Sequence, residues 1–217
     1  MAEGPKIISD LVQAGLKIHS LFSLEEAEGF GVEAAVISPA ELQKISALKT
    51  ANSMLAVFYL PEKPTLPEKG LVVALDAVRD PGNLGTIIRL CDWFGVKALI
   101  CSEDTADCFN PKVVQATMGS IARVGVSYTD LSDYLQSSRK PIYAAVMDGG
   151  NVYNEKLPKD AVLVMGNEAN GISEAVLALI QHKITIPNFG DVNTAESLNV
   201  ATATGILLSE FRRSIET

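Results

Sequence analysis

The stretch ITIPNFGDVNTAESLNVATATGILLSEFRR, residues 184–213, decides the fold of this chain and the position of its site. Its first three residues predict a short strand that Pro187 ends, because proline cannot donate a hydrogen bond to a strand ladder. A turn-forming loop follows, and we expect a helix to begin near Thr194 or Ala195, with Thr194 as its N-cap.

The predicted helix carries its polar residues mainly in its first turn. Glu196, Ser197 and Asn199 stand beside Leu198 and Val200 there, and the run after them is almost entirely apolar. A helix that is buried on most sides and entered through small polar side chains is typical of the wall of a site rather than of a protein surface.

Composition limits the classes of protein to consider. With 217 residues, 47% of them hydrophobic, the chain can bury a substantial core in one large or two small domains. No apolar run approaches the length of a membrane span and the N-terminus does not resemble a signal peptide, so we expect a cytoplasmic protein without a membrane partner. The net charge of -8 argues against broad, nonspecific attraction to nucleic acid and leaves room for a local basic patch.

Cysteine and histidine are too sparse for most catalytic sets. Cys91, Cys101 and Cys108 lack metal-like spacing and predict buried free thiols in a reducing cytosol. His19 lies in the N-terminal part, and His182 follows a predicted helix, where we expect it to be a charge at the C-terminal end. A Ser/His/Asp set, a histidine general base and a metal site are therefore not expected.

A proline-rich stretch, Pro61 to Lys69, divides the chain. It predicts a stiff linker, 61–69, between a small α/β domain, 1–60, and a larger domain, 70–217. The small domain opens on a helix, so its first strand is expected to be missing. Its predicted elements are helices at 6–14 and 38–48 and strands at 16–22, 33–37 and 54–60.

The larger domain shows a regular alternation of strand and helix patterns. This alternation predicts an α/β fold whose parallel sheet is covered by helices on both faces, with ligands bound at the carboxyl ends of the strands. The predicted strands are 71–78, 97–101, 122–126, 142–147, 162–165 and 184–186. The predicted helices before the C-terminal one are 83–94, 112–119, 131–138 and 173–181.

Two further loops follow predicted strands. RDPGNLG (79–85) leads into a helix that carries Arg89, and its glycines and the helix N-terminus favour close approach of an anion. MGNEANGIS (165–173) places two glycines around Glu168, and Ser173 can cap the next helix. Taken alone, the first loop fits a turn before a solvated arginine equally well, and the second fits an acidic turn. Neither GxGxxG nor a Walker sequence is present, so a Rossmann-like nucleotide enzyme is not indicated.

Three ordered motifs resemble those of the SpoU (TrmH) family of SPOUT-class RNA 2′-O-ribose methyltransferases, which depend on S-adenosylmethionine. The motifs are NLGTIIR (83–89) followed by FG, GNE (166–168) followed by a glycine, and IP (186–187) followed by SLNV (197–200). PKVVQATMGS (111–120) also matches a recurrent family segment. The first sixty residues resemble the ribosomal-protein-L30e-like substrate-binding domain that many members carry.

The resemblance implies a C-terminal trefoil knot and an obligate homodimer with its active site at the subunit interface. It also implies S-adenosyl-L-methionine as cofactor, RNA as substrate and no metal. The implied cofactor contacts, made mainly through backbone groups, are Met147, Asp148, Gly149, Gly166, Ile186, Asn188 and Leu198.

The resemblance also assigns roles to the polar residues of the motifs. Arg89 matches the arginine that the family assigns to activating the 2′-hydroxyl. Free arginine is essentially never deprotonated, so we favour a grip on the target phosphate, with a base role for the RNA phosphate or for a perturbed Arg89 left open. Asn83 and Glu168 would orient Arg89 and the substrate, while Ser197 and Asn199 would fix the final loop and line the pocket.

Two features depart from the family pattern. The loop between Pro187 and Ser197 is a few residues longer than usual, and Asn188 stands where a methionine is common, so we expect the cofactor loop to differ in shape. The acidic net charge restricts RNA affinity to a narrow patch, for which the candidates are Arg79, Arg89, Lys112, Arg123, Arg212 and Arg213.

The resemblance therefore predicts a ribose methyltransferase that acts on rRNA rather than tRNA. The alternative from a different class is an RNA-binding or ribosome-assembly protein whose cofactor site is vestigial.

Overall fold

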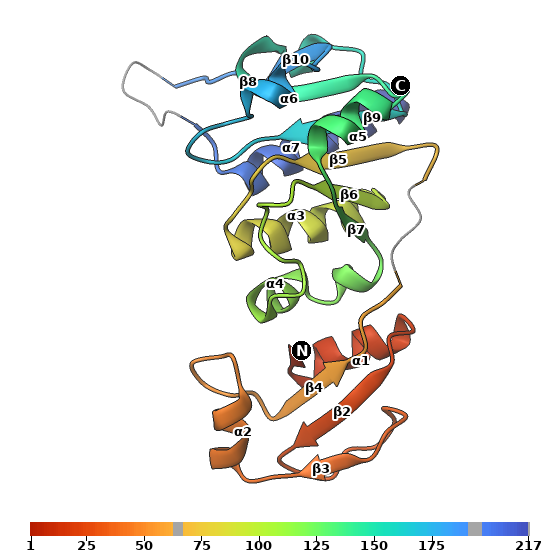
Figure 1. The fold of residues 1–217 in the computed structure, drawn as a ribbon, viewed down its shortest axis with the longest axis vertical. Helices are drawn as coiled ribbons and strands as arrows, with labels where there is room; N and C mark the ends of the chain where they lie inside the picture. The colour runs from red at the N-terminus through yellow and green to blue at the C-terminus, as the bar shows by residue number, and fades with distance from the viewer. Residues whose placement is uncertain (63–66, 191–196, 217) are drawn as a thin grey trace.

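A computed structural model describes residues 1–62, 67–190 and 197–216, with side chains described up to residue 213. The described residues form two sheets, each with its own helices (Figure 1). The expected helix start at Thr194 or Ala195 lies outside these residues, as does the expected position of Glu196.

The N-terminal sheet has four strands in the order β1-β4-β2-β3. A two-residue strand precedes the first helix and pairs antiparallel with β4, so the expectation that a first strand is missing is wrong. The second helix ends at Ile45, earlier than expected, and begins with a capping box between Ser38 and Glu41. The elements are β1 (Ala2–Glu3), α1 (Pro5–Gln13), β2 (Ile18–Ser23), β3 (Ala34–Val36), α2 (Pro39–Ile45) and β4 (Met54–Phe58).

The second sheet has six strands in the order β10-β8-β9-β5-β6-β7, and all of its pairings are parallel. Its central strands consist of apolar residues that are buried on both faces, as expected for a sheet between two helical layers. This confirms the predicted α/β fold with a parallel sheet. The strands are β5 (Leu71–Leu75), β6 (Ala98–Cys101), β7 (Gly125–Tyr128), β8 (Ile142–Asn151), β9 (Ala161–Met165) and β10 (His182–Thr185).

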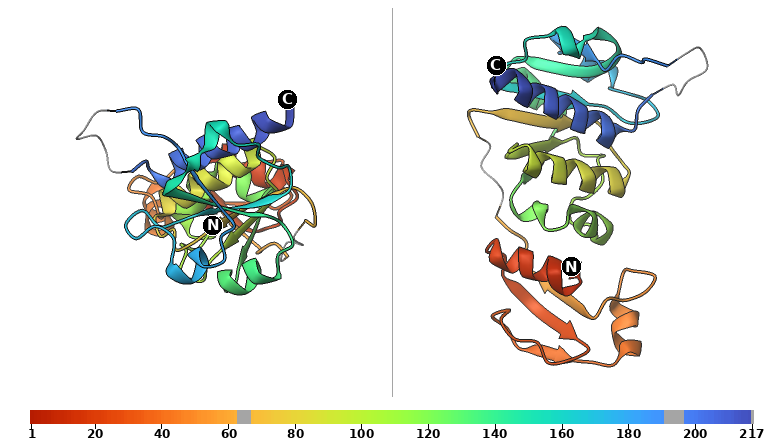
Figure 2. Two further views of the ribbon diagram at one scale, coloured as in Figure 1. Left: turned by 90° about the horizontal axis from the view of Figure 1, so that it is seen from above. Right: turned by 180° about the vertical axis from the view of Figure 1, so that it is seen from behind.

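Helices cover both faces of the six-stranded sheet, and the alternation of side chains along β5 separates the two cores. Leu71, Val73 and Leu75 pack with α3, α4 and α7, while Val72 and Ala74 pack with α5 and α6. α3 and α7 lie side by side (Figure 2). The helices are α3 (Pro81–Trp93), α4 (Pro111–Thr117), α5 (Leu131–Ser137), α6 (Glu174–Leu177) and α7 (Val200–Glu216), with single turns η1 (Ser120–Ala122) and η2 (Val152–Asn154).

Several expected elements differ from those observed. Residues 120–122 form a 3-10 turn, so the strand expected at 122–126 begins only at Gly125. The helix expected at 173–181 is the four-residue α6. His182 is the first residue of β10, and its ring stacks on Tyr143 with the centroids 4.5 Å apart, so it is not a charge at a helix end. None of the described helices is long and apolar enough to cross a membrane.

Candidate functional site

The loop after β5 is held by a cap at the start of α3. The carboxylate of Asp80 accepts a hydrogen bond from the backbone N–H of Asn83 at 2.8 Å, and Pro81 occupies the first helical position. Asn83 therefore lies within the first turn of α3.

The loop after β9 folds back on itself in a tight turn. Asn167 and Gly171 exchange backbone hydrogen bonds, and the side-chain oxygen of Asn167 accepts from the N–H groups of Ala169 and Asn170. Gly166 has no room for a side chain, because a Cβ there would lie 2.4 Å from the backbone carbon of Gly171. This turn presents Glu168 toward the first loop.

The start of α7 brings the third motif to the same place. α7 begins at Val200, so Ser197 and Asn199 precede the helix instead of lying in its first turn. The side-chain oxygen of Asn199 accepts from the N–H groups of Ala201 at 3.0 Å and Thr202 at 3.2 Å. Asn199 is thus the N-cap of α7.

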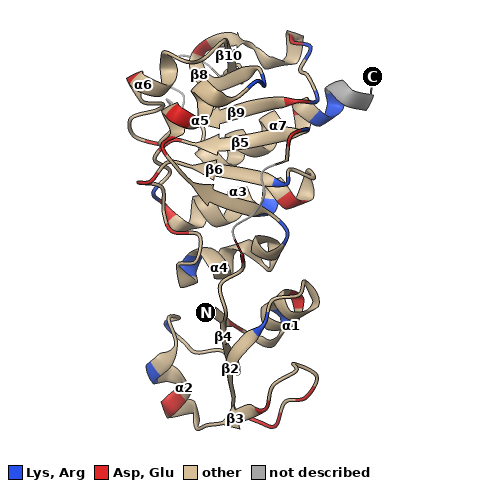
Figure 3. Cartoon of the chain, turned by 45° about the vertical axis from the view of Figure 1, so that its right-hand side comes forward, with Lys and Arg blue, Asp and Glu red and all other residues tan. Residues whose placement is uncertain are grey.

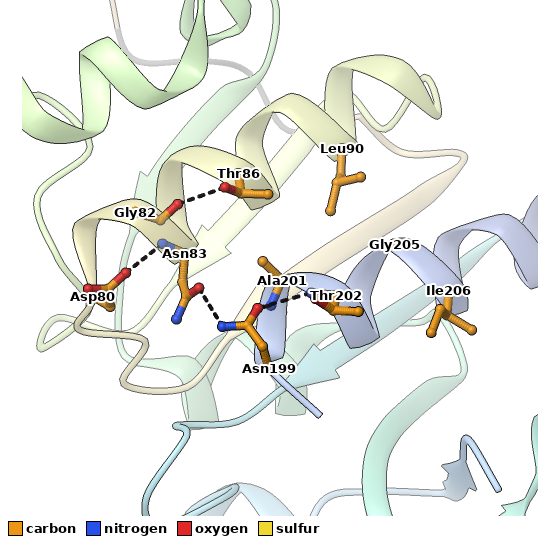
Figure 4. Close-up of a pocket in the computed structure, with 10 residues that line it drawn as sticks. All are labelled: Asp80, Gly82, Asn83, Thr86, Leu90, Asn199, Ala201, Thr202, Gly205 and Ile206. Atoms are coloured by element: carbon orange, nitrogen blue, oxygen red, sulfur yellow. Dashed lines mark hydrogen bonds between the residues drawn. The ribbon is translucent and has the colours of Figure 1, made fainter. Parts of the chain in front are cut away.

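The three loops meet in a chain of hydrogen bonds with a fixed direction. Since the oxygen of Asn199 is occupied by α7, its amide nitrogen donates to the side-chain oxygen of Asn83 at 2.9 Å (Figure 4). The amide nitrogen of Asn83 in turn donates to the carboxylate of Glu168. Each amide in the chain can take only one orientation, so the N-terminal end of α7 sets the orientation of the whole chain.

A groove of about 550 Å³ lies between α3 and α7 beside this chain. Asn83 and Thr86 line it from α3, and Asn199, Thr202 and Gly205 line it from the other side (Figure 4). Thr86 donates to the backbone oxygen of Gly82 in its own helix, so it takes no part in the chain.

A second cavity, of about 730 Å³, lies between the middle of β8, the ends of β9 and β10 and the start of α7. Its walls are mainly apolar side chains and backbone, and Met147 and Leu198 stay 66% and 49% exposed at its edge. Most residues predicted for the cofactor line it, as do two of the predicted catalytic residues. They are Met147, Gly166, Ile186, Asn188 and Leu198, together with Glu168 and Ser197.

Three predicted site residues lie outside both cavities. Asp148 is exposed and forms an ion pair with Lys183 at 3.2 Å. Gly149 packs against the backbone of Ile184, where a Cβ would come within 2.5 Å. Arg89 is exposed on α3 and makes no hydrogen bond or ion pair with the part of the chain that the structure describes, so neither Asn83 nor Glu168 holds it.

Most of the cationic residues proposed for RNA contact are already paired. Arg79 bonds Asp104 at 2.7 Å, Arg123 bonds Asp92 at 2.7 Å and Arg213 bonds Glu210 at 2.7 Å. Arg212 donates to the backbone oxygen of Phe94. Of the candidate patch, Arg89 and Lys112 are the two cations without an ion pair or hydrogen bond to the described residues.

The three cysteines are buried free thiols, as the sequence predicted. Burial raises the pKa of Cys91 to about 12 and that of Cys108 to about 11, and burial also raises the pKa of Cys101. These thiols are therefore neutral at physiological pH. Within the described residues, no group of histidine, cysteine or carboxylate side chains is arranged to hold a metal ion.

The family model of the SpoU rRNA Methylase family matches residues 70–209. This chain belongs to that family. The matched segment runs from β5 into α7 and contains the residues that line both cavities and form the hydrogen-bond chain. The N-terminal sheet lies outside the match.

Relatives of known sequence or structure resemble this SpoU-family chain over most of its length. The 23S rRNA (guanosine(2553)-2′-O)-methyltransferase RlmP of Bacillus subtilis (strain 168) is 32% identical over 186 residues, which is 84% of this chain and 73% of the relative. A TrmH-family structure from Porphyromonas gingivalis has a TM-score of 0.85 and 38% identity, covering 97% of this chain and 88% of that one. An AdoMet-bound rRNA methyltransferase from Sinorhizobium meliloti has a TM-score of 0.82 and 30% identity, covering 97% and 85%.

Sequence reasoning missed the residues that hold the SpoU-family loops together. The buried carboxylate of Asp76 accepts from the N–H of Ser173 at 2.7 Å, and the side-chain amide of Asn167 donates to the backbone oxygen of Ala77 at 2.6 Å. The N–H of Ala77, which has a φ of +58°, donates to Ser102. Asp76 directly follows an apolar strand, and a lone carboxylate in that position was the signal that could have found it.

Proposed function

We propose that this chain is an S-adenosyl-L-methionine-dependent RNA methyltransferase that transfers a methyl group to a ribose 2′-hydroxyl, in rRNA rather than tRNA. The hydrogen-bond chain of Asn83, Glu168 and Asn199, which joins the groove between α3 and α7 to the larger cavity, carries the proposal. Membership of the SpoU family and the names of the relatives from Bacillus subtilis and Sinorhizobium meliloti support the substrate and the cofactor.

The 730 Å³ cavity fits S-adenosyl-L-methionine in size and chemistry. It falls within the range of ligand pockets, about 300–1,000 Å³, and such pockets are mostly apolar with a few polar groups. The lack of space at Gly166 keeps the backbone of the loop after β9 at the cavity wall, where N–H and C=O groups can bind the adenine and amino-acid ends. When bound, the cofactor supplies an already activated methyl group.

The residues of this chain would then orient the ribose and assist the loss of the proton from its 2′-hydroxyl. Glu168 lines the cavity and ends the hydrogen-bond chain, so it can accept a hydrogen bond from a ribose hydroxyl close to the cofactor. Asn83 and Asn199 hold that carboxylate in place, which reduces the reorganisation needed in the transition state. Arg89 is free to bind the target phosphate, and the charge of its guanidinium would lower the pKa of the neighbouring hydroxyl.

The face formed by α3 and α7 supports a proposal for the quaternary structure. The apolar groove residues Leu90, Ala201 and Ile206 lie beside Asn83 and Asn199, so a second copy seated there would complete the site. We therefore propose a homodimer, in which an exposed Arg89 serves the site at the interface. We keep the trefoil knot, the domain division at 61–69 and the L30e-like nature of 1–60 as predictions, and an rRNA substrate would place the protein in the cytoplasm.

Methyl transfer from labelled S-adenosyl-L-methionine to total rRNA tests the proposed function. Arg89→Ala should lower transfer by more than about 10³-fold with little change in the dissociation constant of the cofactor, because arginine is needed only where phosphate and hydroxyl charges develop. Arg139→Ala is the matched control, since Arg139 is also exposed but lies near the amino ends of the strands. If Arg89→Ala and the control have equal activity, the proposed role of Arg89 is wrong.

Calorimetry with S-adenosyl-L-methionine separates the enzyme from the alternative of an RNA-binding protein with a vestigial cofactor site. The enzyme should bind the cofactor and methylate rRNA. RNA binding without any cofactor binding would refute the proposed activity.

A further inference from the structure

α4 lies between the N-terminal sheet and α3 (Figure 1). On one side it packs closely on the first turns of α3, since a Cβ on Gly85 would lie 2.4 Å from the Cβ of Ala116 and 3.1 Å from the backbone oxygen of Val113. Gly85 is two residues from Asn83. α4 is therefore held firmly against α3, in the part of the chain that carries the site.

On its other side, α4 is joined to the N-terminal sheet through Gln115. The side-chain nitrogen of Gln115 donates to the backbone oxygen of Glu3 at 2.8 Å, and its side-chain oxygen accepts from the backbone N–H of Glu3 at 3.4 Å. β1 is an edge strand, so Glu3 has backbone groups that no neighbouring strand takes. Gln115 occupies these groups as a further strand would.

The carboxylate of Glu3 extends this link into the N-terminal sheet. Glu3 is 3% exposed, and its carboxylate accepts hydrogen bonds from the hydroxyl of Ser46 at 2.6 Å and from the N–H of Ala47 at 2.8 Å. Apolar contacts support the link, because Val114 belongs to the same buried cluster as Ile7 and Leu11 of α1. Glu3 thus connects α4 to the segment that follows α2.

Exposed lysines lie on both sides of this link. Lys112 stands one turn before Gln115, and Lys44 and Lys49 flank the segment that Glu3 holds. None of the three forms an ion pair with the described residues. The basic positions of α4 and α2 lie on the same side of the chain (Figure 3). Lys112 also lies at the N-terminal end of α4, which follows the carboxyl end of β6, the edge of the sheet that carries the site.

We propose that Gln115 is a positioning residue for RNA, which fixes the spacing between Lys112 on α4 and two lysines of the N-terminal part, Lys44 on α2 and Lys49 in the segment after it. The inference rests on the proposed function and adds to it a surface that RNA spans. Phosphates bound at both ends gain from the fixed spacing, because the second contact becomes intramolecular. Losing the link should therefore weaken RNA binding without changing the chemistry.

Gln115→Leu tests this proposal, since leucine has nearly the same size and makes neither hydrogen bond. The KM for rRNA should rise by about 5–10-fold, while kcat and the dissociation constant of S-adenosyl-L-methionine change by less than about 2-fold. Gln181→Leu is the matched control, because the side-chain oxygen of Gln181 also accepts from a backbone N–H, that of Ile142, but within the six-stranded sheet. Small-angle scattering should show a larger radius of gyration for Gln115→Leu than for the control.

A second substitution separates positioning from a general loss of structure. Lys44→Ala should raise KM in the wild-type background but add little in the Gln115→Leu background, because the lysine no longer has a fixed position there. If Gln115→Leu folds poorly, Gln115→Glu keeps one acceptor for the N–H of Glu3 and should give an intermediate KM.

Three outcomes would overturn the role of Gln115. They are an unchanged KM and radius of gyration, a fall in kcat instead of a rise in KM, and an equal effect of the Gln181→Leu control. If the wild-type protein methylates no RNA, the proposed function fails, and the scattering comparison still decides whether Gln115 holds the two sheets together.

Discussion

The two cavities of this chain differ in which groups form their walls. The groove between α3 and α7 is lined by Asn83 and Asn199, whose side chains form one directed chain of hydrogen bonds with Glu168 in the wall of the larger cavity. The larger cavity is defined mainly by backbone and apolar groups around Gly166. Substitutions in the first should therefore change the rate of the reaction, and substitutions in the second should change the binding of the cofactor.

The largest loss of cofactor affinity is expected for Gly166→Ala, which changes the backbone wall of the larger cavity. The new Cβ would lie 2.4 Å from the backbone of Gly171, so the loop after β9 must move. We expect cofactor affinity to fall by more than about 100-fold, since a contact of this kind between backbone segments cannot be relieved by a rotamer change. Calorimetry measures this directly.

Gly171→Ala is a milder substitution in the same loop and serves as the control for Gly166→Ala. Gly171 has a φ of +68° but open space around it, so alanine should cost only about 1–2 kcal/mol of backbone strain. A Gly166→Ala protein that binds S-adenosyl-L-methionine as tightly as Gly171→Ala would show that the cavity is not the cofactor site.

The side-chain-built groove is tested by Asn83→Ala. Removing the central amide leaves both Glu168 and Asn199 without their partner, and we expect kcat to fall by about 100-fold with cofactor affinity nearly unchanged. Thr86→Ala is the matched control in the same helix and groove, because Thr86 bonds only its own backbone turn. Steady-state kinetics on rRNA compares the two variants, and similar values of kcat would contradict the role of the chain.

The difference between side-chain and backbone contacts also explains which site residues could be predicted from the sequence. The residues of the hydrogen-bond chain were predicted because the three ordered motifs resemble those of the SpoU family, whereas the first two loops, taken alone, fitted simple turns equally well. The roles of Asp148 and Gly149 were inferred from the resemblance alone, and both residues lie outside the cavity because β8 continues through them to Asn151. An apolar pattern does not locate the end of a strand well, because a strand such as β8 can continue through polar residues.

The positions of other residues depended on contacts that no local pattern contains. Asp76 and Ala77 hold the loop after β9 through partners some ninety residues away, Ser173 and Asn167. Glu3 and Gln115 meet across 112 residues. Such contacts are set by tertiary packing, so the sequence predicted the elements and the polar set but not the links between them.

Asp76→Ala should have a smaller effect than either substitution above. It leaves the N–H of Ser173 without its carboxylate and should destabilise the fold by about 1.5–3 kcal/mol, seen as a lower Tm, with cofactor affinity reduced by about 5–10-fold. Asp130→Ala removes a similar carboxylate-to-backbone bond at the start of α5, away from the cavity. It should lower Tm and leave cofactor affinity unchanged, and equal affinities in the two variants would show that Asp76 does not support the cavity.

The smallest change in stability is expected when the exposed ion pair between Arg79 and Asp104 is removed. The hydrogen bond from Arg79, helped by Ser102, lowers the pKa of the Asp104 carboxyl. A lowered pKa means that this stabilisation is fully present above the pKa of the unfolded chain, near ~3.9, and is lost as the pH falls through the lower value of the folded state. Both side chains are more than half exposed, so solvent limits the contribution to less than about 1 kcal/mol.

Asp104→Asn should therefore lower the free energy of unfolding slightly at pH 7, and the difference from wild type should shrink as the pH falls below the pKa of the unfolded chain, as denaturant titrations over this pH range would show. Methyl transfer should stay within about 2-fold of wild type, because the Asn83 chain does not include this pair. In low salt, RNA affinity should rise, since the substitution releases Arg79 for a phosphate. A large loss of transfer would instead show that Ser102, which bonds both Asp104 and the N–H of Ala77, carries the effect into the loop after β9.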